Sequence, residues 1–351
     1  MGRGKNLVGV DIGSSSIKIC QLNEGRKGLS LLRFAYVPLE PQTVVDGHVM
    51  NVGVVVEALM RAFHDQKIRE RQVAMSVSGQ SVIIRKITIP MMTASELDEQ
   101  IPWEAEQHIP FDIRDVHIDY DILRRRPEAG QMDLLLVAAK RDEINDYAQI
   151  AREAKLKPLV IDIDAFTIQN IFEASQGTLP LETIALINVG ATLSSLNILS
   201  NGVSVFTRDI ANGGSSITEE IQKQLSVPYA QAEAYKAGGD ERGIVPKVVM
   251  DIVHAVADTV AAEIQRSLDF YMATSGETGI TKIYLTGGSA NLPQLVTAIE
   301  RRARAPVEVF SPISRVDLSA SEINAPLVQK HSMQLAVTLG LGLRKEREKH
   351  A

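Results

Sequence analysis

Apolar and polar residues alternate along two stretches of the chain that share one outline: a strand, a short polar turn and a second strand. The first stretch runs from Leu7 to Leu22 and turns at Gly13 and three serines. The second runs from Ile184 to Leu199 and turns at Gly190. A period of two is typical of strands, and glycine and serine favour the turn between them. The pattern therefore predicts two hairpins.

The two hairpins also match each other residue by residue. When the turn glycines are aligned, Gly13 falls on Gly190 and Asp11 falls on Asn188. The offset between the two copies is about half the chain. Self-similarity at such a spacing predicts two related lobes, each opening with its own hairpin.

Other segments predict the elements that surround the hairpins. Further strands are expected at 29–36, 73–78, 158–164 and 281–286, and helices at 54–67, 95–108, 141–154, 164–174 and 246–273. A turn at Gly213 and Gly214 predicts a helix capped by Ser215 or Ser216, with acids in its first turn, that continues to Lys236. We therefore expect an α/β protein with mixed sheets.

The hairpin tips carry groups that suit an anion such as a polyphosphate. Exposed backbone N–H groups and serine hydroxyls donate hydrogen bonds, and two facing tips would form a clamp. Asp11 suits a hydrated Mg²⁺, which takes few protein ligands, and the ammonium of Lys18 suits a terminal phosphate. The alternative is that Asp11 and the serines only satisfy the amides of ordinary turns.

Composition narrows the functional classes. A chain of 351 residues, 45% hydrophobic and 23% charged, is typical of a globular protein with two cores. The formal net charge of −6 disfavours a nucleic-acid partner. Cys20 is the single cysteine, the seven histidines lack the spacing of a zinc site, and no apolar run reaches the length of a membrane span. These features predict a soluble cytosolic protein.

Four motifs, taken in order, resemble those of the actin, sugar-kinase and Hsp70 ATPase superfamily. The phosphate-1, phosphate-2, ribose-facing and adenosine motifs correspond to DIGSSSIK, INVGATLSSL, ANGGSSIT with AEAYK, and IYLTGGSANLPQL. In detail the chain resembles the PilM family, actin-like cytoplasmic proteins of type IV pilus assembly in the FtsA-like branch. That narrower likeness is carried by GVDIGSSSIK, VAMSVSGQSVIIRKITIP, ELDEQIPWEAEQHIPF, LLLVAAKRDEINDY, VIDIDAFTIQN and EIQRSLDFY.

The resemblance implies an actin-like fold of two duplicated RNase-H-like lobes with inserted subdomains around a nucleotide cleft. The first lobe is expected at 1–83 and 157–183, its insert at 84–156, and its closing helix and tail at 321–351. The second lobe is expected at 184–225 and 281–320, with a helical subdomain at 226–280.

The resemblance also implies ATP or ADP as ligand, with Mg²⁺ held by Asp11 through water. Asp11 and Asp164 are the candidates for orienting water, but Asn188 stands where the superfamily usually has an aspartate, so we expect slow or negligible hydrolysis. Glu233 and Lys236 are expected either to hydrogen-bond the ribose and the adenine edge, or to form an ordinary surface ion pair. The nucleotide-binding candidates are Gly13, Ser14, Ser15, Ser16, Lys18, Asn188, Gly190, Ala191, Thr192, Gly213, Gly214, Glu233, Lys236, Gly287, Gly288 and Ser289.

The implied partner is the N-terminal cytoplasmic peptide of the membrane protein PilN. A PilO-linked inner-membrane complex and assembly ATPases are further partners, and a homo-oligomer or ring is left open. Trp103, Ile109, Pro110 and Phe111 form either an interface patch or the core of the insert. No apolar helix follows Leu343, so membrane association is expected only through partners.

Two alternatives remain open from the sequence. One is an FtsA-like division or cytoskeletal ATPase. The other is a small-molecule kinase of the same fold, in which Asp164 would be the base.

Overall fold

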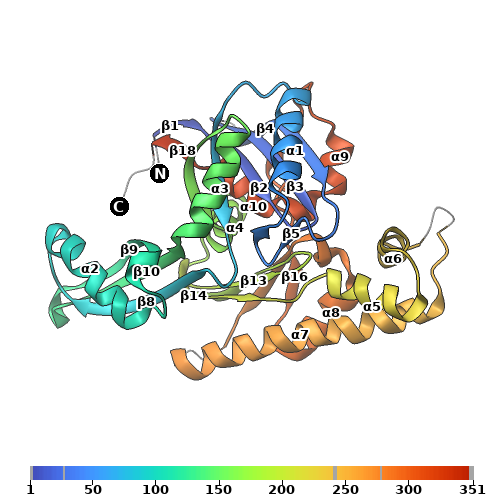
Figure 1. Ribbon diagram of the computed structural model, residues 1–351. Coiled ribbons are helices and arrows are strands. Elements are labelled where there is room, and N and C mark those ends of the chain that lie inside the picture. The colour runs from blue at the N-terminus through green and yellow to red at the C-terminus, as the bar shows by residue number, and fades with distance from the viewer. Residues whose placement is uncertain (1–2, 27, 240–242, 277–278, 348–351) are drawn as a thin grey trace.

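The computed structural model describes residues 3–26, 28–239, 243–276 and 279–347. Two lobes lie one above the other in Figure 1, and a smaller insert projects from their junction at the lower left. We call them lobe I (3–81, 141–176 and 316–347), the insert (82–140) and lobe II (183–310). The nucleotide cleft is expected where the two lobes face each other.

Lobe I is built on a six-stranded mixed sheet with the order β11-β7-β2-β3-β4-β17. Its strands are β2 (Val8–Ile12), β3 (Ser16–Gly25), β4 (Gly28–Pro38), β7 (Gln72–Val77), β11 (Lys157–Ile163) and β17 (Val316–Asp317). Its helices are α1 (Val52–Asp65), α3 (Arg141–Glu153), α4 (Asp164–Gln176), α9 (Ala325–Lys330) and α10 (Ala336–Gly342). Short strand pairs β1 (Arg3–Asn6) with β18 (Lys345–Arg347), and β5 (Val44–Val45) with β6 (His48–Val49), complete the lobe.

Lobe II contains a five-stranded sheet with the order β14-β13-β12-β15-β16. Its strands are β12 (Thr183–Val189), β13 (Ser194–Ser200), β14 (Val203–Ile210), β15 (Lys282–Thr286) and β16 (Val307–Val309). Its helices are α5 (Ser215–Leu225), α6 (Tyr229–Lys236), α7 (Lys247–Ser275) and α8 (Pro293–Ala303). The long α7 runs beneath the sheet in Figure 1.

The predicted duplication is confirmed by the order of the strands. In each lobe three consecutive antiparallel strands form a meander, and the next two strands add in parallel beside the first. Lobe I reads β4-β3-β2-β7-β11 and lobe II reads β14-β13-β12-β15-β16. The hairpin that opens each lobe therefore occupies the same place in its sheet.

The insert is a three-stranded antiparallel sheet covered by one helix. Its elements are β8 (Val82–Pro90), β9 (Val116–Arg126), β10 (Gln131–Lys140) and α2 (Ala94–His108), and the sheet order is β8-β10-β9. The helix begins in a capping box between Thr93 and Glu96.

The packing of α3 differs from the expected boundary of the insert at residue 156. Tyr147, Ile150 and Ala151 are buried in the core that lies under α1 and the lobe I sheet. The helix therefore packs with lobe I, and the compact insert ends at β10. In the same way, β17 returns to lobe I by pairing with β4 before residue 321.

The helices after the Gly213 turn also differ from the prediction. Helix α5 has Gly214 as its N-cap, no side-chain cap and no acid in its first turn. Ser215 Oγ instead donates to the carbonyl of Ala191 at 2.7 Å, so its hydroxyl fastens the loop to the second hairpin. The helix ends at Leu225, and α6 begins separately after Pro228, because proline does not continue a helix.

Candidate functional site

The tips of the two hairpins meet across the junction of the lobes. Thr192 Oγ1, in the turn between β12 and β13, donates to Ser14 Oγ, in the turn between β2 and β3, at 3.1 Å. Both turns close in the same way: the N–H of Gly13 donates to the carbonyl of Ser16, and the N–H of Gly190 donates to that of Leu193. Residues half a chain apart therefore share one site.

Lys18 and Asp11 form an ion pair on the first hairpin. Lys18 Nζ lies 3.0 Å from Asp11 Oδ2, and the two side chains are 9% and 12% exposed. A Cβ on Gly13 would lie 2.9 Å from Lys18 Nζ, so glycine leaves room for the ammonium at the turn. Ser16 Oγ is buried without a hydrogen-bond partner in the described part of the chain.

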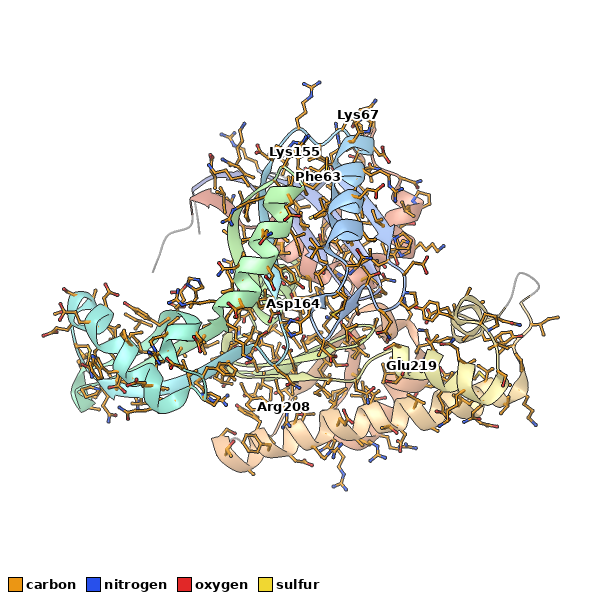
Figure 2. All side chains as sticks on the ribbon, in the orientation of Figure 1. Phe63, Lys67, Lys155, Asp164, Arg208 and Glu219 are labelled. Carbon is orange, nitrogen blue, oxygen red and sulfur yellow. The ribbon has the colours of Figure 1, made fainter. Side chains whose placement is uncertain are left out.

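Asp164 is the first residue of α4 and lies between the two lobes in Figure 2. Ser76 Oγ donates to its carboxylate at 2.5 Å. Burial raises the pKa of Asp164 to about 7, and the negative charges of Asp11 and then Asp209 act in the same direction. The charges of two other carboxylates therefore act on Asp164.

Asp209, near the end of β14, was not singled out from the sequence. Its carboxylate accepts a hydrogen bond of 2.5 Å from the N–H of Gly79, and burial raises its pKa. In the sequence, only its place in a strand shortly before the Gly213 turn pointed to a role in the site. That signal is weak, because most such residues face solvent.

The remaining glycines of the site bring three loops of lobe II together. The N–H of Gly214 donates to the carbonyl of Gly190 at 2.9 Å, and Ser289 Oγ reaches the same oxygen at 3.3 Å. A Cβ on Gly213 would lie 2.5 Å from the carbonyl of Ala191. Gly287 has φ +99°, and a Cβ there would lie 2.4 Å from the carbonyl of Val189. The close approach that these glycines allow is between backbone segments.

Gly288 lies at the edge of this cluster. A Cβ on it would lie 3.4 Å from Cγ of Gln334, so the double glycine also faces the segment that precedes α10.

Glu233 and Lys236 lie one turn apart on α6, and Lys236 Nζ is 2.5 Å from Glu233 Oε1. Lys236 Nζ also donates to the carbonyl of Gly214 at 3.2 Å and to Thr218 Oγ1 at 2.7 Å, and Thr218 donates to Glu233. The pair is therefore joined to the start of α5 and is more than a solvated surface pair. It lies beside the glycine loops.

The aromatic patch expected around Trp103 is divided between the core and the surface of the insert. Ile109 is buried in the insert core and Phe111 packs against it, with Lys140 Nζ 4.9 Å from the Phe111 ring centre. Trp103 is 66% exposed and Pro110 is also exposed. Trp103 is thus available to a partner, whereas Ile109 serves folding.

A hollow of about 420 Å³ lies elsewhere, between α5 and α7. Glu219, Glu220, Lys223 and Val256 are among the residues that line it. Its carboxylates would repel an anion such as a polyphosphate.

Among the described residues, no helix has both the length and the apolar character needed to cross a membrane. Within the same residues no group of three or more histidine, cysteine, aspartate or glutamate side chains is arranged to hold a metal ion.

Two lobes with a repeated strand order and facing hairpins define the actin-like ATPase fold, as expected from the motifs. The family model described as type IV pilus assembly protein PilM matches residues 9–346, and the chain belongs to that family.

Solved structures agree with this assignment. A chain of a PilM–PilN type IV pilus biogenesis complex is 25% identical over 97% of this chain and 99% of its own, with a TM-score of 0.84. The ethanolamine utilization protein EutJ from Carboxydothermus hydrogenoformans is 13% identical, covering 97% and 90%, with a TM-score of 0.58. MreB5 of Spiroplasma citri bound to AMPPNP is 11% identical, covering 88% and 92%, with a TM-score of 0.50. The last two similarities concern the fold alone.

Proposed function

We propose that this protein binds ATP or ADP with Mg²⁺ between its lobes and captures the N-terminal cytoplasmic peptide of a PilN-type membrane protein, so that nucleotide state governs assembly of the pilus machine. The observation that carries the nucleotide part is the contact between Ser14 and Thr192, with Lys18 beside it. Facing turns rich in N–H and hydroxyl donors, together with an ammonium, suit a polyphosphate.

The carboxylates fit a hydrated divalent cation. Asp11 and Asp164 repel each other strongly enough to contribute to the raised pKa of Asp164, and a bound cation would relieve that repulsion. Mg²⁺ keeps several of its own waters, so a site of few carboxylates is sufficient. When bound, the ion would neutralise phosphate charge, while Asp11 and Asp164 orient its waters and Lys18 pairs with phosphate oxygens.

The partner part is supported by family membership and by the neighbour whose structure is a complex with PilN. We place the peptide between lobe I and the insert, and we place the protein on the cytoplasmic side of the inner membrane, held there through partners. A PilO-linked complex and the assembly ATPases are further candidates for contact.

Calorimetric titration tests both parts. Wild-type protein is titrated with Mg-ATP, and then with a synthetic peptide of the PilN N-terminus in the presence and absence of Mg-ATP. We expect both ligands to bind, and we expect the factor by which ATP changes the peptide affinity to equal the factor by which the peptide changes the ATP affinity. Absence of heat with Mg-ATP, confirmed by a fluorescent ATP analogue, would contradict nucleotide binding.

A further inference from the structure

The link from lobe I to the insert passes through the mouth of the cleft. Strand β7 ends at Val77 and β8 begins at Val82, so residues 78–81 form the link. The chain leaves the insert at the end of β10, where the N–H of Lys140 donates to the carbonyl of Ser81 at 3.0 Å. Both chain crossings therefore lie side by side. Two adjacent crossings act as a hinge, about which a small subdomain turns unless another contact holds it.

Strand β8 of the insert lies against β14 of lobe II, and lobe II also holds the link itself. The N–H of Gly79, in the middle of the link, donates to Asp209 Oδ2 at 2.5 Å, across 130 residues of sequence. Gly79 has φ +88°, a conformation that favours glycine, and a Cβ there would lie 3.6 Å from Leu193 Cδ1. The link thus touches β14 and the turn of the second hairpin at one point.

The carboxylate of Asp209 is held from its own side as well. Ser195, its cross-strand partner on β13, hydrogen-bonds to it, and Ser195 is buried. Ser195 lies three residues after Thr192, which contacts Ser14 of the first hairpin. Asp209 thus lies between the second hairpin and the link.

We propose that Asp209 is a positioning residue that makes the insert follow lobe II, so that closure of the lobes on a nucleotide changes the angle of the insert. The coupling to nucleotide depends on the proposed function, whereas the restraint on the insert does not. The restraint is the hydrogen bond from the Gly79 N–H to Asp209, because a hydrogen bond from a backbone N–H to a carboxylate is strong and directional.

The test compares Asp209→Ala, which removes the acceptor, with Asp209→Asn, which keeps an acceptor oxygen but removes the charge. Spin labels are attached at Gln107→Cys on α2 and Thr297→Cys on α8, both exposed positions. Cys20 is completely buried and donates its thiol hydrogen to the Thr338 carbonyl, so it does not compete for label. The exposed Asp251→Ala on α7 is the matched control.

In nucleotide-free protein we expect a narrow distance distribution for wild type, Asp251→Ala and Asp209→Asn, and one at least about twice as wide for Asp209→Ala. We also expect Asp209→Ala to keep the peptide affinity of the nucleotide-free protein but to lose the change caused by Mg-ATP, and Asp209→Asn to restore it. The thermal midpoint of each variant confirms that it is folded.

An unchanged width in Asp209→Ala would overturn the proposal. Equal broadening in Asp209→Asn would also overturn it, because the charge and not the hydrogen bond would then hold the insert. If wild type fails to bind Mg-ATP, the proposed function is wrong, and the width of the distribution still decides whether Asp209 restrains the insert.

Discussion

Asp164 shows how one residue responds to its surroundings in the cleft. Its pKa is raised from 3.8 to about 7, first by burial and then by the charge of Asp11. A carboxyl whose folded pKa exceeds its unfolded pKa binds more protons in the native state between those values. Its contribution to the free energy of unfolding therefore falls as the pH rises from about 4 to 7.

Replacing Asp164 by asparagine should remove this penalty while keeping an acceptor for Ser76. In urea unfolding without nucleotide or metal, Asp164→Asn should be more stable than wild type at pH 8, by up to about 4 kcal/mol, since the pKa shift spans about three units and each unit corresponds to about 1.4 kcal/mol. At pH 3, where the carboxyl is protonated in both the folded and the unfolded state, the difference should vanish.

The control is Asp258→Asn, because hydrogen bonds from Arg302 and Arg301 lower the pKa of Asp258. It should lose stability at pH 8 instead of gaining it. A loss in Asp164→Asn at pH 8 would show that the carboxylate is stabilised in the free protein.

The ammonium of Lys18 is expected to contribute to nucleotide affinity. Lys18→Met keeps the length of the buried chain but removes the ammonium that pairs with Asp11. We expect the Kd for Mg-ATP to rise about 10- to 100-fold, which corresponds to the roughly 1.5–3 kcal/mol of a hydrogen bond to a charged group. The exposed Lys223→Met should bind as wild type does; equal affinities in both variants would place the phosphate elsewhere.

Helix α10 packs very closely against the backbone of its neighbours α4 and β2. A Cβ on Gly340 would lie 1.9 Å from the carbonyl of Thr167 in α4, and one on Gly9 in β2 would lie 2.3 Å from the carbonyl of Thr338. Glycines on both sides allow the helix to contact α4 and the lobe I sheet together. The helix predicted to close lobe I depends on these positions.

Two identical substitutions should therefore have opposite effects. Gly340→Ala should lower the free energy of unfolding by about 1–3 kcal/mol or more, because α10 must move away from α4. Gly53→Ala in α1, where the nearest atom is 3.8 Å away, should raise it by up to about 1 kcal/mol through helix propensity. Chemical denaturation measures both, and equal changes would contradict the packing.

Helix α2 allows a similar test of its two faces. Ile101 is 5% exposed in the insert core and Trp103 is 66% exposed. Ile101→Ala should cost about 2–5 kcal/mol, whereas Trp103→Ala should change stability by less than about 0.5 kcal/mol. Weaker peptide binding by Trp103→Ala, measured by calorimetry at unchanged stability, would identify Trp103 as an interface residue.

At the scale of the whole molecule, the two lobes share a hydrophobic core. Residues of α4 and α10 pack together with Leu186, Leu199 and Tyr284 of lobe II. The hairpin contact and the Gly79–Asp209 contact also join the two lobes. Such an arrangement favours small changes of lobe angle over separation of the lobes.

We expect the molecule to act through binding and to turn over ATP at less than about 1 per second, at the low end of the enzyme range. The physical reason is Asn188, whose amide supplies no negative charge to a metal ion and no base. Steady-state phosphate release measures the rate. Faster turnover, absent in an Asp11→Asn control, would make the protein an active ATPase, and a phosphorylated metabolite would make it a kinase.

The sequence by itself determined the local elements and the duplication. The alternation around Gly13 and Gly190, the capping box at Thr93 and the helix start at Pro293 are decided by neighbouring residues, so they can be read along the chain. The pair of Asp11 and Lys18 belongs to the same class, because a hairpin places the two residues opposite each other.

Only the tertiary structure decided where those elements pack. Helix α3 belongs with lobe I because Tyr147 and Ile150 fill its core, and Asp209 became part of the cleft because Gly79, 130 residues away, donates to it. The glycines at 213 and 287 allow loop-to-loop contact for the same reason. Contacts between distant residues depend on how the lobes come together, and no short-range pattern encodes that.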